Sequence, residues 1–395
     1  MKRLNRLYWK IVSRENLLLA DEIARKGKSK QYGIRQFDKN KEKNIDLLRE
    51  MLLKKTYRTS TYTTFKVYEP KERIVYRLPY FPDRIAHHAI MNILEPIFVS
   101  VFTADTYSCI KGKGIHGAQR AVRRALNDEE GTKYCLKLDI KKFYPSIDHD
   151  ILKSLLRQKF KDKDLLWLLD EIIDSTSGIP IGNYLSQYFA NFYLSYFDHW
   201  IKEVKGIKYY FRYADDLVIL SSDKKSLQKI LWEIKEYLSV NLKLVIKGNY
   251  QVFPVESRGI DFVGYNLKHS HTLLRKSIKK NFARKMAKHP NMASIASYYG
   301  WAKHCDSKTL LKKLIPNETI QRLQHRQAAT ERIHRRQNKD RQNIKQGNYR
   351  FGLQTRRFQS QAEHQVLTSS NKDKRDNACS LHRINCFDRC YPPSG

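Results

Sequence analysis

Two apolar segments separated by a short acidic stretch place the strongest constraint on how this chain folds. Residues Ile207–Tyr213 and Leu217–Ser221 are apolar and aromatic, and Ala214, Asp215 and Asp216 lie between them. Apolar runs this close together predict a β-hairpin, because the chain can only reverse between them. We therefore predict a tight turn that presents both aspartates. An ordinary acidic β-turn would have the same local pattern, so a second feature is needed to assign a role.

That second feature is Asp139, at the end of another predicted strand, Tyr134–Ile140. Phosphodiester formation builds charge on the attacking and leaving oxygens, and two Mg²⁺ ions about 3.5–4 Å apart can stabilise both. Mg²⁺ binds oxygen ligands, usually one or two carboxylates together with substrate phosphates. Asp139 at the tip of a strand and Asp215 on a neighbouring hairpin would supply these ligands. We expect two Mg²⁺ ions here, for which Mn²⁺ can substitute.

The charge of the chain indicates what it binds. Its formal net charge is +35, from 75 Lys and Arg against 40 Asp and Glu. Such a charge repels itself in a compact state unless an acidic partner neutralises it, so a nucleic acid or an anionic membrane is expected. No apolar run approaches the roughly 20 residues that cross a bilayer. The six cysteines include no CxxC pair, which suits a reducing compartment. We expect a cytoplasmic protein with no membrane partner.

The remaining apolar pattern predicts an α+β fold. Helical periodicity at Asn16–Ala24 and Ile45–Leu53 precedes two β-rich runs, Thr61–Tyr68 and Arg73–Leu78. Further helices are expected at Asp83 to about Phe98 with an interruption at Pro96, at Ile115–Leu126, at roughly Asp150–Asp174, from Gly182 to about Val204, and at Lys225–Leu238. Further strands are expected at Leu242–Ile246 and Ile260–Tyr265.

The segment from His271 to Ile315 carries 11 Lys and Arg against one acid, with aromatic residues interleaved. Basic side chains neutralise phosphates, and aromatic faces stack on bases or sugars. The segment therefore predicts a helical domain that grips nucleic acid, although a solvated basic helix bundle has a similar composition. The residues expected to bind nucleic acid here are Arg275, Lys276, Lys279, Lys280, Trp301 and Lys303.

Three motifs occur in order along the centre of the chain: LDIKKFY at 138–144, IPIGNYLSQ at 179–187 and FRYADDLV at 211–218. The YADD turn alone is moderately specific, but the ordered set is highly specific. On these motifs, residues from about 60 to 315 resemble a reverse transcriptase. The resemblance implies a right-hand polymerase fold, with fingers, a palm built on an antiparallel sheet, and a helical thumb.

The resemblance also divides the chain. It implies an N-terminal helical extension at 1–58, fingers at 59–130, a palm at 131–268 with a fingers insertion at about 149–180, and a thumb at 269–316. Residues 317–395 form a basic polar tail whose composition favours disorder.

The catalytic roles follow from the resemblance. It implies metal binding by Asp139, Asp215 and the carbonyl of Ile140, with Asp216 in a supporting catalytic and metal-binding role. Lys247 lies where the family places a proton donor for pyrophosphate, although Lys243 is close by in the sequence.

The nucleotide-binding roles are likewise implied. Tyr144 matches the aromatic residue that excludes a ribose 2′-hydroxyl, although a core aromatic residue would fit the same pattern. Lys66 and Arg73 match two cations that hold the incoming triphosphate, and we expect strand pairing to bring them to one surface. Nucleotide contacts are also expected at Ile181, Gly182 and Gln187. The segment Gly259–Tyr265 resembles the primer-gripping hairpin, with nucleic-acid contacts at Gly264 and Tyr265.

The second motif discriminates among reverse transcriptases. Its pattern from Ile181 to Ser186 and Gln187, with the thumb run 297–305, is similar to the enzymes of diversity-generating retroelements. This implies copying of a template-repeat RNA, from a primer and with dNTPs, into cDNA with frequent errors at adenines. It also implies a small oligomeric accessory variability protein as a partner. Ile181 could instead simply pack the loop. The alternatives are a retron, abortive-infection or group II intron-like reverse transcriptase, and a non-catalytic RNA-binding relict.

The tail allows two interpretations. After about Ile320 the chain loses its hydrophobic periodicity, as a disordered basic RNA-binding tail would. The other interpretation is a one-nucleotide frameshift, because codons compatible with the segment from Ile333 onward can encode strand-like patterns in the next frame. Cys379, Cys386 and Cys390 would then not form a metal site. The nucleotide sequence of the gene distinguishes the two, since stop codons in the shifted frame would exclude a frameshift.

Overall fold

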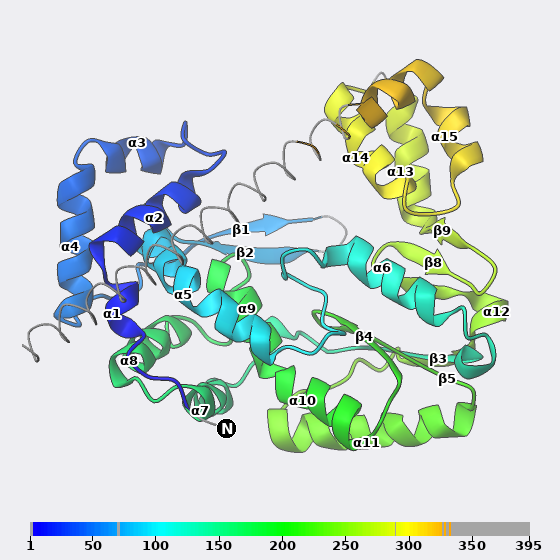
Figure 1. The fold of residues 1–395 in the computed structure, drawn as a ribbon, viewed down its shortest axis with the longest axis horizontal. Helices are drawn as coiled ribbons and strands as arrows, with labels where there is room; N and C mark the ends of the chain where they lie inside the picture. Colours follow the sequence, from blue (N-terminus) through cyan, green and yellow to red (C-terminus); the bar gives the residue numbers. More distant parts are fainter. Residues whose placement is uncertain (1–2, 69–71, 289, 326–327, 329–331, 333–395) are drawn as a thin grey trace, which may run out of the picture. The chain divides into compact units, whose positions relative to one another are not determined.

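The structure is a computed structural model that describes residues 3–68, 72–288, 290–325, 328 and 332 (Figure 1). The chain divides into two compact units, residues 1–314 and 315–395. Within the second unit, residues 317–325 are helical. Most of the predicted tail, residues 333–395, lies outside the described residues, so both interpretations of it stay predictions.

The N-terminal segment forms four helices: α1 (Tyr8–Ile11), α2 (Arg14–Arg25), α3 (Tyr32–Asp38) and α4 (Lys41–Leu53). Helix α2 begins after Ser13, whose hydroxyl accepts the N–H of Asn16 (3.2 Å) and so satisfies a free donor of the first turn. The helices bury one apolar face each, and α2 packs against α4 and α5. The two predicted helices of this segment are confirmed.

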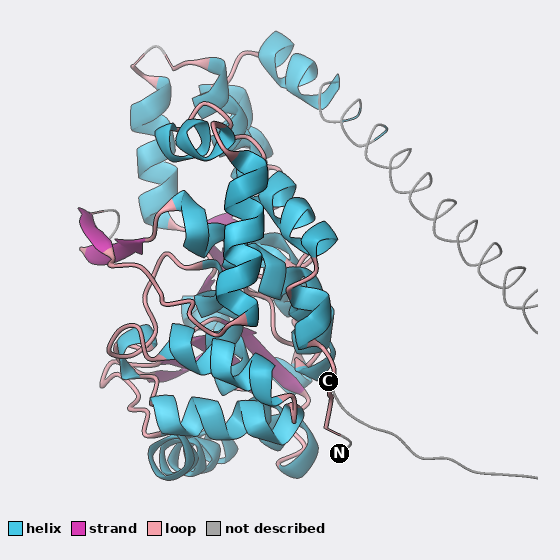
Figure 2. Ribbon diagram, turned by 90° about the vertical axis from the view of Figure 1, so that its left-hand side faces the viewer, coloured by secondary structure: helices cyan, strands magenta, loops and turns pink. Residues whose placement is uncertain are grey.

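Strands β1 (Thr63–Val67) and β2 (Arg73–Arg77) form an isolated antiparallel ribbon. Every side chain of β1 is exposed, and Figure 2 shows the ribbon extending away from the neighbouring helices. Among the described residues, no third strand pairs with this ribbon, so its position depends on contacts at its base.

Helix α5 (Ile85–Val101) follows a π-helical turn at Tyr80–Arg84. The predicted interruption at Pro96 is wrong, because α5 continues for five residues beyond it. Proline removes one backbone hydrogen bond from a helix. Here α5 is buried against α1, α2 and α9 (Tyr184–Tyr193), and this packing outweighs the loss.

The central sheet is antiparallel, in the order β4-β5-β3-β6. Its strands are β3 (Tyr134–Asp139), β4 (Tyr209–Tyr213), β5 (Asp216–Ser221) and β6 (Gln251–Pro254). Four consecutive residues of β5, Leu217–Leu220, are buried, because α11 (Lys224–Leu242) contacts β3, β5 and β6 and the neighbouring elements cover the rest (Figure 1). Helix α6 (Gly114–Ala125) packs on β4. This order places the end of β3 beside the β4–β5 turn.

The predicted strand at Leu242–Ile246 is wrong. Helix α11 continues to Leu242, and Lys243 then adopts a left-handed conformation (φ 50°) that ends the helix. The N–H of Leu244 bonds to the carbonyl of Leu238 (2.9 Å), which is a common way to satisfy the last turn of a helix. The sheet is completed instead by β6, and Ile246 makes one isolated bridge to Ile140.

Two helices, α7 (His149–Lys159) and α8 (Lys163–Ile173), are inserted between β3 and the second motif. Each begins at an aspartate, Asp148 or Asp162, whose carboxylate accepts a backbone N–H of the first turn. The single helix predicted up to Val204 is divided into α9, α10 (Ser195–His199) and a π-helical turn at Trp200–Val204. Residues 178–182, which cannot be helical because they combine two glycines with Pro180, adopt neither helix nor strand.

The C-terminal part of the first unit combines a small sheet with three helices. The strands β7 (Ile260–Phe262), β8 (Tyr265–Leu267) and β9 (Thr272–Leu274) are antiparallel and follow the short helix α12 (Val255–Arg258). The helices are α13 (Lys276–Met286), α14 (Met292–Ala302) and α15 (Lys308–Leu314). Phe282 of α13 is buried and stacks on Tyr298 of α14, with ring centroids 5.0 Å apart.

Within the described part of the chain, no helix combines the length and the apolar character needed to span a membrane.

We predict that Asp162→Ala destabilises the fold more than an ordinary cap substitution. Asp162 is buried, and its carboxylate accepts N–H groups from Leu165 of α8 and from Leu7 and Tyr8 of the N-terminal segment. Removing it leaves buried donors without acceptors, at about 1–3 kcal/mol, in addition to the loss of the cap. Urea unfolding measures the difference.

The matched control is Asp223→Ala, which removes an exposed N-cap from α11. It should cost about 1 kcal/mol. Equal losses in the two variants would show that the contacts of Asp162 with the N-terminal segment contribute nothing.

Candidate active site

The predicted acidic turn is a tight hairpin between β4 and β5. Tyr213 pairs with Asp216 across it, so only Ala214 and Asp215 form the turn. Ala214 has a left-handed backbone (φ 54°), which is unfavourable for a residue with a Cβ. The strands on either side determine this conformation, because they are buried along most of their length.

Asp139 lies next to the turn. It is the last residue of β3 and pairs with Asp216, while the N–H of the following residue, Ile140, donates to the carbonyl of Asp215 (3.2 Å). Burial raises the pKa of Asp215, and the neighbouring charge of Asp139 raises it further. The structure therefore brings together the two carboxylates that the sequence predicted as metal ligands.

Asp216, the first residue of β5, lies at the same end of the sheet but in a more buried setting. Burial raises its pKa from 3.8 to about 7, and Asp139 and Asp215 act in the same direction. Its Oδ1 has no hydrogen-bond partner. The nearest cation is Lys137, whose Nζ is 3.7 Å from that oxygen. Lys137 is not among the residues predicted from the sequence, although a lysine two residues before Asp139 must share its face of β3.

Lys247 contacts Asp139 twice. Its backbone N–H donates to the carbonyl of Asp139 (2.8 Å), and its ammonium forms an ion pair with the carboxylate. Lys243, the alternative in the sequence, is bound to Asp148 instead (2.7 Å). Of the two lysines, the structure thus places Lys247 at the carboxylates.

The arrangement fits divalent cations. The candidate ligands are carboxylate and carbonyl oxygens, which Mg²⁺ prefers, and an ammonium group already occupies one of the carboxylates. The buried Oδ1 of Asp216 lacks a hydrogen-bond partner. Burial, and then the charges of neighbouring carboxylates, raise the pKa values of Asp215 and Asp216, so a bound cation would favour their ionised forms. Among the described residues there is no cluster of three or more His, Cys, Asp or Glu that could hold a metal. Two carboxylates still suffice where substrate phosphates complete the coordination.

Tyr144 lies beside this site in a short 3₁₀ turn, Tyr144–Ser146. Burial raises the pKa of its hydroxyl, and Cys109 and Asp215 raise it further, so the ring is near the β4–β5 turn. Its carbonyl accepts the N–H of Ile179 (2.9 Å). The ring is partly buried against Phe143, so both expectations for Tyr144, nucleotide contact and core packing, fit its position.

The second motif contacts the base of the β1–β2 ribbon. The carbonyl of Ile181 accepts the N–H of Tyr76 from β2 (2.7 Å). Gly182 has φ 123°, and a Cβ there would lie 2.2 Å from the carbonyl oxygen of Tyr76, so only glycine permits this approach. The side chain of Ile181 is half-buried, and Gln187 is exposed on α9.

The expectation that strand pairing brings Lys66 and Arg73 to one surface is wrong. The register pairs Lys66 with Ile74 and Val67 with Arg73. Directly paired residues share a face and successive residues alternate, so the two cations leave opposite faces of the ribbon. Both are exposed, and Lys66 forms an ion pair with Glu72 (2.7 Å). Their roles in triphosphate binding stay predictions.

Tyr265 does not offer its ring to a nucleic acid, contrary to the sequence-based expectation. It is fully buried, and its hydroxyl contacts the carbonyl of Trp301 and Nδ1 of His116, each at 3.0 Å. Gly264 has φ 88°, and a Cβ there would lie 2.4 Å from the ring of Trp301. Gly264 and Tyr265 therefore join β8 to α14 through close packing.

The basic residues of α13 keep the exposure that binding to phosphates requires. Lys276, Lys279 and Lys280 are exposed, whereas Arg275 is half-buried and pairs with Asp261 (2.6 Å). Lys303 is exposed at the end of α14, where Trp301 is half-buried.

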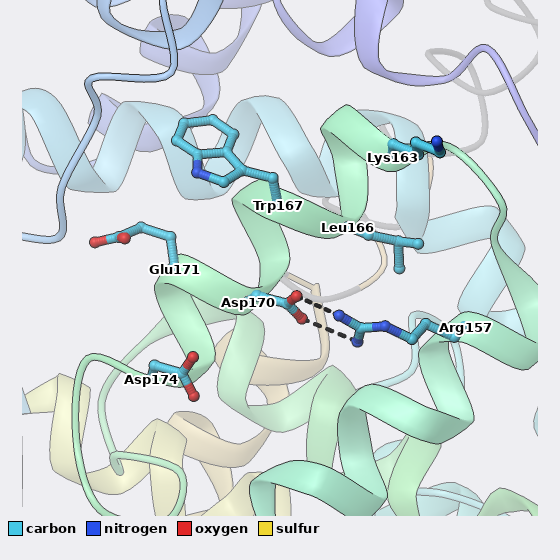
Figure 3. Close-up of a pocket in the computed structure, with 7 residues that line it drawn as sticks. All are labelled: Arg157, Lys163, Leu166, Trp167, Asp170, Glu171 and Asp174. Carbon is cyan, nitrogen blue, oxygen red and sulfur yellow. Dashed lines mark hydrogen bonds and ion pairs between the residues drawn. The ribbon is translucent and has the colours of Figure 1, made fainter.

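A surface pocket on α7 and α8 contains none of the predicted site residues (Figure 3). Its lining includes Trp167, Glu171 and the ion pair between Arg157 and Asp170. The carboxylate site lies instead at the ends of β3 and β5, the two central strands of the sheet.

An antiparallel sheet with carboxylates at the ends of its two central strands, a β-ribbon and a basic helical segment define a palm-type polymerase fold. Residues 66–267, just over half of the chain, match the family described as "Reverse transcriptase (RNA-dependent DNA polymerase)". The chain belongs to this family and carries an RNA-dependent DNA polymerase domain.

Several curated proteins are similar to the chain. The protein YkfC of Escherichia coli is 24% identical over 271 residues, which cover 56% of this chain and 71% of YkfC. The group II intron-encoded protein LtrA of Lactococcus lactis is 27% identical over 32% of this chain and 23% of LtrA. The retron Ec73 reverse transcriptase of E. coli is 26% identical over 51% of this chain and 69% of that protein. The chain thus spans less than a quarter of LtrA.

Among solved structures, apo telomerase from Candida tropicalis aligns with a TM-score of 0.42 and 11% identity. The alignment covers 61% of this chain and 56% of that chain.

The raised pKa of Asp216 predicts how stability depends on pH. A carboxyl group whose pKa rises from 3.8 to about 7 on folding opposes folding once it ionises. The free energy of unfolding therefore falls as pH rises from about 4 to about 7. Asp216→Asn removes the penalty. We expect the variant to be more stable than the wild type by about 1–3 kcal/mol at pH 8.

Urea unfolding in a chelating buffer at pH 8 and at pH 4 measures the difference in the free energy of unfolding. The gap between variant and wild type should narrow toward pH 4, where Asp216 is protonated in the folded protein and only partly ionised in the unfolded chain. A gap that does not change with pH would mean that the charge of Asp216 is already compensated in the folded protein.

Proposed function

We propose that this chain is the reverse transcriptase of a diversity-generating retroelement. It would copy a template-repeat RNA into cDNA with frequent errors at adenines. Polymerase chemistry is supported by the meeting of Asp139 and Asp215 at the end of β3, together with the family membership. The subtype is supported by the Ile181-Gly182 and Ser186-Gln187 pattern of the second motif.

In the proposed reaction the primer 3′-oxygen bonds to the α-phosphorus of a dNTP, and the bond from that phosphorus to pyrophosphate breaks. Two bound Mg²⁺ ions, or Mn²⁺ in their place, would offset charge on the attacking and leaving oxygens. Asp139, Asp215 and the Ile140 carbonyl would hold these ions, with Asp216 in support. Lys247 would transfer a proton to pyrophosphate, and its ion pair with Asp139 at the same site supports this role.

Tyr144 would select deoxyribonucleotides by occupying the space of a ribose 2′-hydroxyl. Its place beside Asp215 supports this role. Ribonucleotide incorporation by Tyr144→Ala measures it, and unchanged incorporation would leave Tyr144 as a packing residue.

The exposed lysines of α13 would hold the template and primer through their phosphates. A small oligomeric accessory variability protein is the expected protein partner. The flanking DNA tests this subtype, because a near-identical repeat pair differing only at adenines would identify the retroelement.

A retron, abortive-infection or group II intron-like enzyme is the alternative, and the similarity to LtrA and to the Ec73 retron enzyme favours it. Flanking DNA that encodes a structured retron RNA or an intron would support it. A non-catalytic relict is a further alternative that the intact carboxylates disfavour.

We predict that Asp139→Ala and Asp215→Ala each abolish primer extension on an RNA template, because each removes a ligand of the proposed metal pair. Template affinity, measured by fluorescence anisotropy, should persist because the basic thumb carries it. Asp150→Ala, which removes an exposed carboxylate from α7, is the control. Substantial extension by either active-site variant would refute the metal-ligand assignment.

We predict that Ile181→Gln lowers misincorporation opposite template adenine more than opposite the other bases. An apolar residue cannot hydrogen-bond the incoming sugar, and one neutral hydrogen bond contributes about 0.5–1.5 kcal/mol. The fall should therefore be about two- to tenfold. Sequencing of cDNA products measures it, with the exposed Ile23→Gln on α2 as the control. An unchanged adenine error spectrum would leave Ile181 as a residue that packs the loop.

A further inference from the structure

A fully buried ion pair lies directly behind the catalytic turn. Arg212 of β4 and Asp198 of α10 are both completely inaccessible to solvent. The Nε of Arg212 donates to Asp198 Oδ1 (2.8 Å), and its Nη2 donates to Asp198 Oδ2 (2.5 Å). Tyr210 and Thr106 donate their hydroxyls to the same carboxylate, so its oxygens are saturated.

The remaining donors of Arg212 reach the turn. Its Nη1 donates to the carbonyl of Ala214 (3.1 Å) and to Oδ1 of Asn191 on α9 (3.0 Å). Ala214 is the residue with the unfavourable left-handed backbone. One guanidinium group thus connects a buried carboxylate to the strained residue immediately before Asp215.

The backbone of Arg212 is held as firmly as its side chain. Its N–H donates to the carbonyl of Asp105, and its carbonyl accepts the N–H of Tyr107, both at 3.0 Å. The loop of residues 105–107 therefore pairs with the outer edge of β4 at this one position. A guanidinium anchored on both sides has little freedom to move away from the turn.

Stability alone does not account for such a pair. Removing two charges from water is costly, and well-packed apolar residues are often as stabilising as a buried ion pair. What an apolar residue cannot do is donate to the Ala214 carbonyl. A lysine could not replace this arrangement either, because only the planar guanidinium presents several donors in fixed directions.

We propose that Arg212 is a positioning residue, which Asp198 and Asn191 hold so that it fixes the Ala214 carbonyl and thereby the carboxylate of Asp215. Its catalytic consequence rests on the proposed polymerase function. Displacing a catalytic group by about 1 Å can cost on the order of 100-fold in rate.

The first test compares Arg212→Lys with Arg25→Lys. Arg25 also binds a buried aspartate, Asp21, through several hydrogen bonds, but it lies in α2, among the N-terminal helices. Both variants exchange a guanidinium for an ammonium at a buried carboxylate. At a temperature where both remain folded, Arg212→Lys should lower kcat for primer extension at least tenfold. Arg25→Lys should leave kcat within about twofold of the wild type.

The second readout is amide hydrogen exchange of the peptide covering residues 211–217, without nucleotide or metal. Arg212→Lys should speed exchange in this peptide and leave α11 unchanged, whereas Arg25→Lys should change neither. This measurement does not depend on polymerisation. An inactive wild type would refute the proposed function, and exchange at the turn would still test the positioning role.

Asn191→Ala serves if Arg212→Lys does not fold. It keeps the ion pair with Asp198 and removes the second acceptor of Nη1, together with two hydrogen bonds between Asn191 and Ser108. A loss in kcat of about two- to tenfold is expected, with faster exchange at 211–217. Equal losses of kcat in Arg212→Lys and Arg25→Lys would overturn the proposal. Unchanged exchange at the turn in the folded Arg212 variant, or in Asn191→Ala in its place, would also overturn it.

Discussion

Mutual repulsion of three carboxylates is the constraint around which this structure is organised. Burial and the like charges of neighbouring carboxylates both raise the pKa values of Asp215 and Asp216. Because ionised carboxylates repel one another, Asp139, Asp215 and Asp216 would move apart if side-chain contacts alone held them in place. They stay together because each belongs to a backbone hydrogen-bonded in an antiparallel sheet. Lys247 and Lys137 offset part of the charge. The folded sheet thus stores electrostatic free energy that bound cations can release.

Contacts on two sides attach the small β7–β9 sheet to neighbouring helices. Arg123 of α6 donates to the carbonyls of Lys268 and His269, which connects α6 to the turn between β8 and β9. Gly264 and Trp301 connect the same small sheet to α14. The basic surface of α13 is therefore carried on a support that is packed against the body of the protein and does not hang from a single linker.

The sequence predicted those parts of the site that depend on short-range pattern. The hairpin around Asp215 and the strand ending at Asp139 were predicted from apolar runs on either side of a turn. Such patterns are visible in a short stretch of sequence. Register does not show in such patterns, so the faces of Lys66 and Arg73 were predicted wrongly. The Arg212–Asp198 pair joins residues on different elements, and only an arginine within an otherwise apolar strand hinted at it. Burial of Tyr265 likewise depends on α14, which is distant in sequence.

The attachment of the β1–β2 ribbon has a mechanical consequence. The two strands pair only with each other, and at Tyr76 their backbone is bonded to Ile181 with no side chain between them. The ribbon is therefore attached at its base to the loop that carries the second motif, and it would pivot about that loop. A displacement of the exposed end of the ribbon would move the backbone of Ile181 directly, because the two segments are joined by a backbone hydrogen bond and not through a side chain that could change its rotamer. A ligand bound to the ribbon would therefore act on the loop that carries Ile181, which is the residue that the proposed function assigns to the incoming nucleotide.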